Sequence, residues 1–160
     1  MSMHIIPVQS QQEIDIIRNL FMEYARSLDF DLGFQNFEDE LSELPGRYAS
    51  PDGRLLLGLV GDEPAGCVAL RKLAPEICEM KRLWVRPSFR GKGLGRQLAA
   101  AVIEEAVTAG YHLMRLDTVA SMSSAVSLYR QIGFYETTPY THNPLSNALF
   151  LEKSLRDRHG

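Results

Sequence analysis

Cysteine is scarce in this chain of 160 residues, which contains only Cys67 and Cys78. Their spacing fits neither a disulfide framework nor a set of zinc ligands, so we expect no disulfide scaffold and no metal. Long hydrophobic runs are absent too. The N-terminus lacks an apolar signal region, and no stretch approaches the length of a membrane span. These absences predict a protein of the reducing cytoplasm that has no membrane partner.

Low-complexity tracts, internal repeats and linker-like stretches are also missing. A chain of this length therefore predicts a single domain over residues 1–160. Hydrophobic residues make up 45% of it, which is enough for a real core and argues against disorder. The net charge of −3 argues against a protein built as a whole to bind nucleic acid.

The charged residues are unevenly distributed along the chain. Six of the 17 basic residues fall between positions 81 and 96, where no acid occurs, whereas six acids and no base fall between positions 29 and 43. A nucleic-acid-binding module is one interpretation of the basic stretch, and it predicts salt-dependent binding. The acidic total argues against that interpretation, and so does the small number of aromatic residues in the stretch, which are Trp84 and Phe89.

The basic stretch contains three glycines at alternate positions, Gly91, Gly93 and Gly95, after a strand-like run that ends at Val85. A helix is predicted from about Gly93. Glycine lets a ligand approach the backbone, and the first N–H groups of a helix point outwards at the positive end of its dipole. The segment therefore predicts an anion cradle suited to phosphate. Neither G-x-x-x-x-G-K-[ST] nor G-x-G-x-x-G occurs, which excludes the two commonest phosphate loops.

Three segments in order carry a resemblance to a known family. The R-x-x-G-x-G pattern from Arg90 to Gly95 resembles the pyrophosphate loop of the GNAT superfamily, the acetyl-CoA-dependent N-acetyltransferases. It follows a strand reading L-W-V-R-P over residues 83–87. Residues 125–134 read A-V-S-L-Y-R-Q-I-G-F, similar to the family's A-x-x-L-Y-x-x-x-G-F segment. The order of predicted elements extends the resemblance over nearly the whole chain, with the motifs concentrated between residues 79 and 134.

Hydrophobic periodicity and turn residues predict an α/β protein. The expected strands cover residues 4–8, 54–60, 65–72, 77–85, 113–119, 134–138 and 148–155, and the expected helices cover 11–28, 36–45, 93–109 and 122–132. Gly58 and Gly66 lie inside an expected hairpin as candidate bulges. The resemblance implies the GNAT fold, a mixed central sheet of about seven strands, mostly antiparallel with a parallel centre, flanked by about four helices.

Helix ends are marked by capping signals. Ser10 with Glu13 forms a capping-box pattern at the start of the first helix. Asn36 and Ser121 are expected to cap the second and fourth helices. Gly110 stands where a C-terminal glycine cap of the third helix belongs.

The resemblance implies which residues bind acetyl-CoA. Backbone N–H groups from about Gly91 to Arg96 would bind the pyrophosphate, with Arg90 and Lys92 adding charge. The expected set is Leu83, Trp84, Val85, Arg90, Gly91, Lys92, Gly93, Leu94, Gly95, Arg96, Ser123 and Tyr129. The chain departs from the family at Met122, where many members have an asparagine that contacts the cofactor arm. Ser123 or Ser124 could substitute for it.

The acceptor amine must lose a proton before it attacks, because an amine of pKa near 10 is almost fully protonated at pH 7. Glu79 matches the position of the base glutamate in histone-acetyltransferase members of the family. The alternative is that Glu79 pairs with a neighbouring base such as Lys81 or Arg71. Asp117, on the next strand, is a second candidate base.

Two further roles follow from the resemblance. The family stabilises the oxyanion with a backbone N–H beside a bulge, which by position is that of Val85, with Trp84 as a second contributor. The hydroxyl of Tyr129 would protonate the leaving thiolate. Its alternative role is packing on the apolar face of its helix, together with Leu128 and Ile132.

The function implied is N-acetyl transfer from acetyl-CoA to a primary amine of a small molecule or peptide, by direct attack in a ternary complex. A non-catalytic acyl-CoA-binding sensor is the alternative. In the family the acidic run from Asp29 to Glu43 borders the acceptor, so one hypothesis is that it attracts a cationic amine. The loop around His142 resembles the variable loop that closes over the acceptor. Exposed edges of the terminal strands are compatible with a homodimer.

Overall fold

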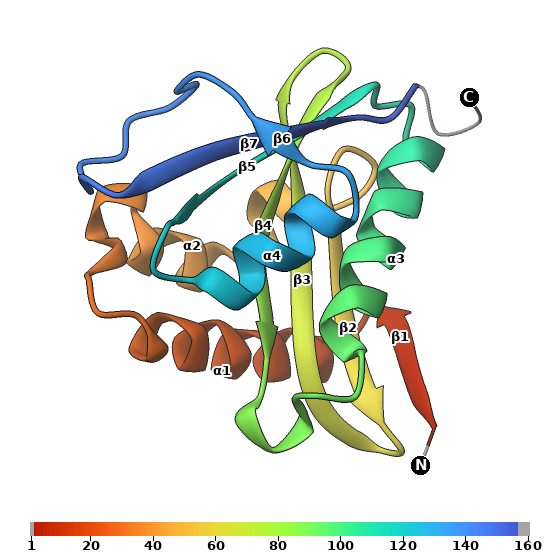
Figure 1. The fold of residues 1–160 in the computed structure, drawn as a ribbon. Helices are drawn as coiled ribbons and strands as arrows, with labels where there is room; N and C mark the ends of the chain where they lie inside the picture. The colour runs from red at the N-terminus through yellow and green to blue at the C-terminus, as the bar shows by residue number, and fades with distance from the viewer. Residues whose placement is uncertain (1, 157–160) are drawn as a thin grey trace.

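The structure, a computed structural model that describes residues 2–156, is built on one seven-stranded sheet in the order β1-β2-β3-β4-β5-β7-β6 (Figure 1). The strands are β1 (Met3–Pro7), β2 (Arg54–Val60), β3 (Glu63–Ala74), β4 (Ile77–Val85), β5 (Leu113–Val119), β6 (Tyr135–Glu136) and β7 (Ala148–Ser154). Within the described chain β4 and β5 run parallel and the other neighbouring strands antiparallel. The predicted mixed sheet with a parallel centre is confirmed.

Helices cover both faces of this sheet. They are α1 (Gln11–Ser27), α2 (Phe37–Glu43), α3 (Leu94–Thr108) and α4 (Ser123–Gln131), with short 3₁₀ turns at Leu32–Gln35, Gly46–Tyr48 and Pro87–Phe89. Figure 1 shows α1 and α2 behind the sheet and α3 and α4 in front of it. The four predicted helices are therefore confirmed.

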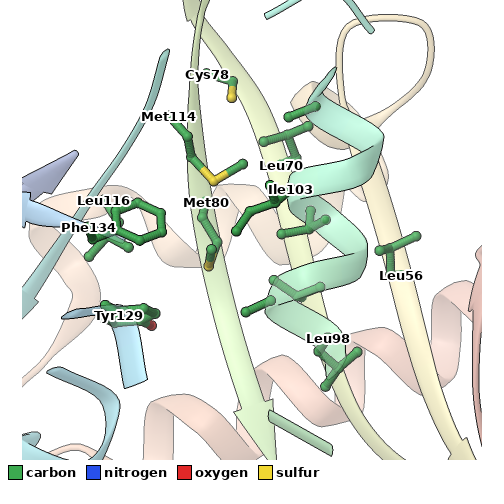
Figure 2. Packing of buried hydrophobic residues seen from close by; sticks show 14 of the residues in the cluster. Leu56, Leu70, Cys78, Met80, Leu98, Ile103, Met114, Leu116, Tyr129 and Phe134 are labelled. Carbon is green, nitrogen blue, oxygen red and sulfur yellow. The ribbon is translucent and has the colours of Figure 1, made fainter. Parts of the chain in front are cut away.

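Two hydrophobic cores fix these layers. On one face, Leu98, Val102 and Ala106 of α3 pack with β-strand residues such as Met80 and Met114. Figure 2 shows Leu98 and Ile103 pointing from α3 towards the strands. On the other face, Ile17, Leu20 and Phe21 of α1 pack against Leu57 and Tyr48. The helical spacing of the apolar residues in α1 and α3 thus places each helix against its own face of the sheet.

Several local signals behave as predicted. Ser10 caps α1, because its Oγ accepts from the Glu13 N–H at 3.1 Å and Glu13 Oε1 accepts from the Ser10 N–H at 3.1 Å. Gly110 follows the end of α3 with φ of +94°, as a glycine cap requires. The register of β2 against β3 shifts next to Gly58, which confirms an irregularity there.

The same shift lies beside the other candidate, because Gly58 pairs with Gly66 and Leu59 with Pro64, which leaves Ala65 as the extra residue of β3. Gly66 pairs in register with both Gly58 and Val85, and the irregularity between β3 and β4 lies further on, between Cys67 and Ala69. Glycine is needed at position 66 for another reason, since a Cβ there would lie 2.5 Å from the carbonyl oxygen of Trp84. Close approach of two strands, in addition to the neighbouring bulge, explains this glycine.

Three boundary predictions were wrong in detail. Met122 rather than Ser121 precedes α4, because the Met122 N–H bonds Val119 O in a turn and delays the helix start by one residue. Asn36 does precede α2, but in the left-handed conformation and without a side-chain capping bond. The sixth strand is limited to β6, since Pro139 soon follows and has no N–H to donate.

The sheet opens at its centre, and this opening positions the site. The parallel pairing of β4 with β5 stops at Glu79 and Arg115. Arg82 then adopts φ of +60°, and between Cys67 and Ala69 one residue of β3 faces an extra residue of β4. This is a β-bulge, and bulges bend the strand that carries them. Beyond it the facing edges of β4 and β5 no longer pair with each other.

Candidate active site

The turn between β4 and α3 exposes a row of main-chain N–H groups. Gly91 and Gly93 have φ of +80° and +86°, values that favour glycine. A Cβ at either position would meet nothing within 4 Å, so the surface of the loop is open. Gly93 is the N-cap of α3 and offers no side chain, and within the described chain the N–H groups of residues 91–96 have no hydrogen-bond partner. The predicted anion cradle is therefore present as a geometry.

A cavity of about 580 Å³ lies over this turn. Its walls are the end of β4, the glycine turn and the beginning of α4. Its lining residues are Ser27, Leu83, Trp84, Val85, Phe89, Arg90, Gly91, Gly93, Leu94, Gly95, Ser121, Met122, Ser123, Ser124, Ala125 and Leu128. A cavity of this size, with an apolar floor and an anion cradle at one end, suits an elongated ligand that carries a phosphate group.

Most residues expected to bind the cofactor line this cavity, but three do not. Lys92 lies beside the ring of Phe89, with Nζ 6.0 Å from the ring centre, and the Arg96 guanidinium bonds the side chain of Gln131. Tyr129 lines a neighbouring chamber instead. Ser123 and Ser124 both reach the cavity beside Met122, at the position where the chain departs from the family pattern.

Arg90 ties the glycine turn to the strand before it. Its Nε donates to the carbonyl oxygen of Val85 at 3.0 Å, and its guanidinium lies 4.8 Å from the ring centre of Trp84. These two contacts of Arg90 fix the position of the anion cradle relative to the end of β4. The positive charge of Arg90 also remains at the cavity wall.

The N–H of Val85 faces the opened edge of β4. The Arg86 N–H bonds Ala65 O on β3 at 2.8 Å, and successive N–H groups of a strand point to opposite edges. The Val85 N–H therefore points away from β3, towards the side that β5 has left. An N–H on this edge is available to an oxygen in the large cavity, which is the geometry that the predicted oxyanion role needs.

A smaller chamber of about 40 Å³ lies where β4 and β5 separate. It shares Leu83 and Met122 with the large cavity, so the two adjoin. Its other lining residues are Tyr24, Gln35, Met80, Lys81, Arg82, Leu116, Asp117, Thr118 and Tyr129. Charged and hydroxyl groups from both separated strands meet here.

Tyr129 reaches this chamber from α4 while its ring packs in the core. The ring lies edge-on to Phe134, with centroids 5.8 Å apart, and Figure 2 shows both beside Leu116 on the far side of Met80 from α3. Its hydroxyl has no hydrogen-bond partner among the described residues. Burial raises the pKa of Tyr129, so at neutral pH its oxygen carries the proton that a general acid must donate. Tyr129 therefore both packs in the core through its ring and lines the chamber.

Glu79 is fully buried and already has two partners. Its Oε1 is 2.6 Å from Arg71 Nε, and its Oε2 accepts the Tyr140 hydroxyl at 2.6 Å. Burial opposes ionisation, but the charges of Lys81 and Arg71 and these hydrogen bonds together lower the pKa of Glu79 below its usual value. Glu79 lines neither the large cavity nor the chamber. The pairing with Arg71, weighed above as the alternative, is present, and the role as base stays a prediction.

A third cavity of about 250 Å³ lies under the segment that carries the acidic run. Asp39, Glu40 and Glu43 line it together with Arg47 and Arg71. Gln35 lines both this cavity and the small chamber, so the two adjoin at its side chain. His142 is exposed on the loop before β7 and lines none of these spaces.

Sequence reasoning missed the residues that organise the chamber. Lys81 is 7% exposed and donates to Gln35 Oε1 at 2.8 Å. Arg82 is buried in a two-pronged ion pair with Glu40, with N–O distances of 3.0 and 2.8 Å. Lys81 and Arg82 both belong to the basic stretch, and at the bulge, where Arg82 has a positive φ, both side chains turn towards Gln35 and Glu40. No pattern in the sequence marks that conformation.

Within residues 2–156 no group of three or more His, Cys, Asp or Glu side chains is placed to hold a metal ion. Nor does any helix in that range combine the length and the apolar character needed to cross a bilayer.

An opened mixed sheet with an anion cradle at the strand-to-helix turn is an α/β architecture suited to a phosphate-bearing ligand, and comparison with known proteins identifies the family. The profile described as the Acetyltransferase (GNAT) family matches residues 14–134. An uncharacterised N-acetyltransferase of Schizosaccharomyces pombe is 40% identical over 146 residues, which cover 90% of each chain. The chain belongs to the GNAT acetyltransferase family.

Solved structures agree on the fold. An acetyltransferase of the GNAT family from Staphylococcus aureus superposes with a TM-score of 0.80 at 18% identity, covering 96% of this chain and 99% of the other. The PaiA N-acetyltransferase of Thermoplasma acidophilum, solved in complex with coenzyme A, superposes with a TM-score of 0.73 at 18% identity, covering 96% and 99%. The predicted superfamily and fold are confirmed.

Proposed function

We propose that this protein transfers the acetyl group of acetyl-CoA to a primary amine of a small molecule or peptide, by direct attack in a ternary complex. The observation that carries the proposal is the row of unpartnered N–H groups over residues 91–96, which opens into a cavity of about 580 Å³. The coenzyme A held by the Thermoplasma relative supports it. None of the observations favours a binding-only sensor over an enzyme.

In this proposal the pyrophosphate binds at the turn around Gly93 and the pantetheine arm lies along the open edge of β4. Hydrogen bonds to a charged group contribute roughly 1.5–3 kcal/mol each, so a few N–H groups at the start of α3 support micromolar-range binding after association costs. The thioester then reaches the junction between the large cavity and the chamber, beside Leu83 and Met122.

The chemical steps use groups that surround this junction. The amine nitrogen attacks the thioester carbon, and the oxygen becomes an oxyanion that the Val85 N–H stabilises. As the C–S bond breaks, Tyr129 gives its proton to the thiolate, and the nitrogen loses a proton that restores the tyrosine. The products are an amide and the free thiol of coenzyme A.

The proton lost before attack needs its own acceptor. Deprotonating an amine of pKa near 10 at pH 7 costs roughly 4 kcal/mol. Glu79 is proposed for this role through water, since it is buried and does not line the chamber, and its lowered pKa keeps the carboxylate ionised at neutral pH. Asp117 lines the chamber directly and is the second candidate.

Two measurements test the proposed function. Calorimetry with purified protein and acetyl-CoA should show saturable binding in the micromolar range, and a thiol reagent should detect coenzyme A release that depends on an added amine. Binding without release across a broad amine panel would indicate the sensor, and absence of binding would remove both interpretations.

The same panel tests the hypothesis on the acidic run, three of whose carboxylates line the third cavity. Cationic amines should show higher kcat/KM than neutral ones. Better turnover of the neutral amines would remove this hypothesis.

A further inference from the structure

Arg82 lines the chamber, and Arg71 of β3 and Arg115 of β5 lie outside its lining; each of the three is paired with a carboxylate. The pairs are Arg71–Glu79, Arg82–Glu40 and Arg115–Glu152, with N–O distances of 2.6, 2.8 and 3.3 Å. Each carboxylate lies close enough to offset the charge of its arginine. These pairs shape the walls and leave little net charge for a ligand to bind.

Lys81 and Asp117 are the two charges left over. Lys81 Nζ donates to Gln35 Oε1 at 2.8 Å, and Asp117 Oδ2 accepts from Asn143 Nδ2 at 3.1 Å. Between residues 2 and 156 neither forms an ion pair, although both line the same chamber. Each is therefore oriented by a neutral amide that does not cancel its charge.

Such an arrangement is costly in the empty protein. A buried charge is unfavourable unless an opposite charge compensates it. Burial, followed by the nearby charge of Arg82, lowers the pKa of Lys81 to about 8, and the charges of Glu79 and Asp117 offset this only in part. A ligand that supplied a negative group to Lys81 and a positive group to Asp117 would satisfy both.

We propose that the acceptor is a zwitterion of the amino-acid type, whose carboxylate binds Lys81 and whose amino group lies towards Asp117. The assignment rests on the proposed acetyl transfer and specifies its substrate class. It also places the amino group in the chamber that Tyr129 lines, next to the junction with the large cavity.

The cavities accommodate the rest of such an acceptor. The chamber of about 40 Å³ has room for a charged head group and little more. The third cavity, of about 250 Å³, adjoins it at Gln35 and provides space for a side chain. On its wall Asp39, Glu43 and Arg47 form no ion pair with any described residue, which leaves an excess of negative charge and disfavours an acidic side chain there.

The first experiment needs no substitution. Acetyl-CoA-dependent thiol release is measured with the twenty protein amino acids, β-alanine and γ-aminobutyrate, and then with the carboxamide and the decarboxylated amine of each acid that reacts. An α-amino carboxamide has a lower amine pKa than its acid, so unselective chemistry favours the carboxamide. The inference expects the opposite order, with kcat/KM for the acid higher roughly tenfold or more.

The second experiment removes the cation. Lys81→Met should lower kcat/KM for the best acid roughly ten- to a hundredfold, mainly through KM, and should leave the carboxamide nearly unchanged. Lys72→Met is the matched control, because Lys72 is an exposed lysine on β3 that lines none of the three spaces described above. Circular dichroism and coenzyme A affinity show whether each variant is folded.

The outcomes separate this inference from the function on which it rests. Carboxamides or simple amines that react as well as acids, or a Lys81→Met variant that keeps the preference for acids, overturn the zwitterion assignment and leave acetyl transfer standing. If none of the amines causes the protein to release coenzyme A, both the zwitterion assignment and acetyl transfer are overturned. Should Lys81→Met fail to fold, the acid-to-carboxamide ratio of the unsubstituted protein still decides the question.

Discussion

Replacing Tyr129 by phenylalanine separates its two roles. The change removes one oxygen, and within the described chain that oxygen makes no hydrogen bond, while the edge-on contact with Phe134 at 5.8 Å is kept. The free energy of unfolding should therefore stay within about 0.5 kcal/mol, because no hydrogen bond within the described chain is lost. Loss of a general acid should lower kcat roughly a hundred- to ten-thousand-fold.

Tyr111→Phe is the matched control, because it should give the opposite result. The Tyr111 hydroxyl donates to Asp52 O at 2.6 Å, and Tyr111 lies outside the cavities. Its loss should cost about 1 kcal/mol of stability, or a fall in Tm of roughly 2–4 °C, without affecting kcat.

The assay combines thermal unfolding, coenzyme A titration and thiol release. Tyr129→Phe should keep the Tm and the affinity for coenzyme A while losing turnover. A variant that retains kcat refutes the role as proton donor, and one that loses Tm by several degrees refutes the claim that its hydroxyl has no partner.

Three further changes test the cradle, the chamber wall and the buried carboxylate. Gly93→Ala and Gly110→Ala each place an alanine in the left-handed conformation at one end of α3, where φ is +86° and +94°. Each variant should lose about 1 kcal/mol of stability in urea unfolding, but only Gly93→Ala should weaken coenzyme A binding in calorimetry. Equal affinities of the two variants for coenzyme A contradict this prediction. Glu40→Ala should lower the free energy of unfolding by about 3 kcal/mol, because it leaves Arg82 buried and unpaired; a loss below 1 kcal/mol contradicts this. The pKa of Glu79 is lowered from its ordinary 4.5. The stability that its ionised carboxylate contributes is therefore complete above pH 4.5 and is lost as the pH falls through the pKa of Glu79 in the folded protein. Glu79→Gln should flatten the acid side of the stability–pH curve, and an unchanged slope contradicts this prediction.

The features that could be predicted from sequence depend on local chemistry. The spacing of Leu98, Val102 and Ala106 sets the buried face of α3, and Ser10 with Glu13 sets the start of α1. The glycine turn could also be predicted from sequence, because the positive φ values of Gly91 and Gly93 favour glycine at those positions. Each of these signals lies within a few residues of the structure it determines.

The features that could not be predicted depend on contacts between distant segments. The positive φ of Arg82 persists because Glu40, 42 positions earlier, holds its guanidinium. The sequence suggested Arg71 as a partner of Glu79, but it gave no sign of the bond from Tyr140, which lies 61 positions later. Neither contact leaves a periodicity or a composition signal, so the interior of the chamber had to come from the structure.

The bond from Tyr140 to Glu79 has an evolutionary consequence. Because that tyrosine fastens the segment before β7 to the middle of the sheet, the residues on either side of it are free to change in length and chemistry without dislodging the segment. The glycine turn lies on other strands and helices and does not touch this tether. Under the proposed function, substitutions around Tyr140 and Gln35 would change the acceptor preference and leave the glycine turn, which would hold the acyl donor, unaltered.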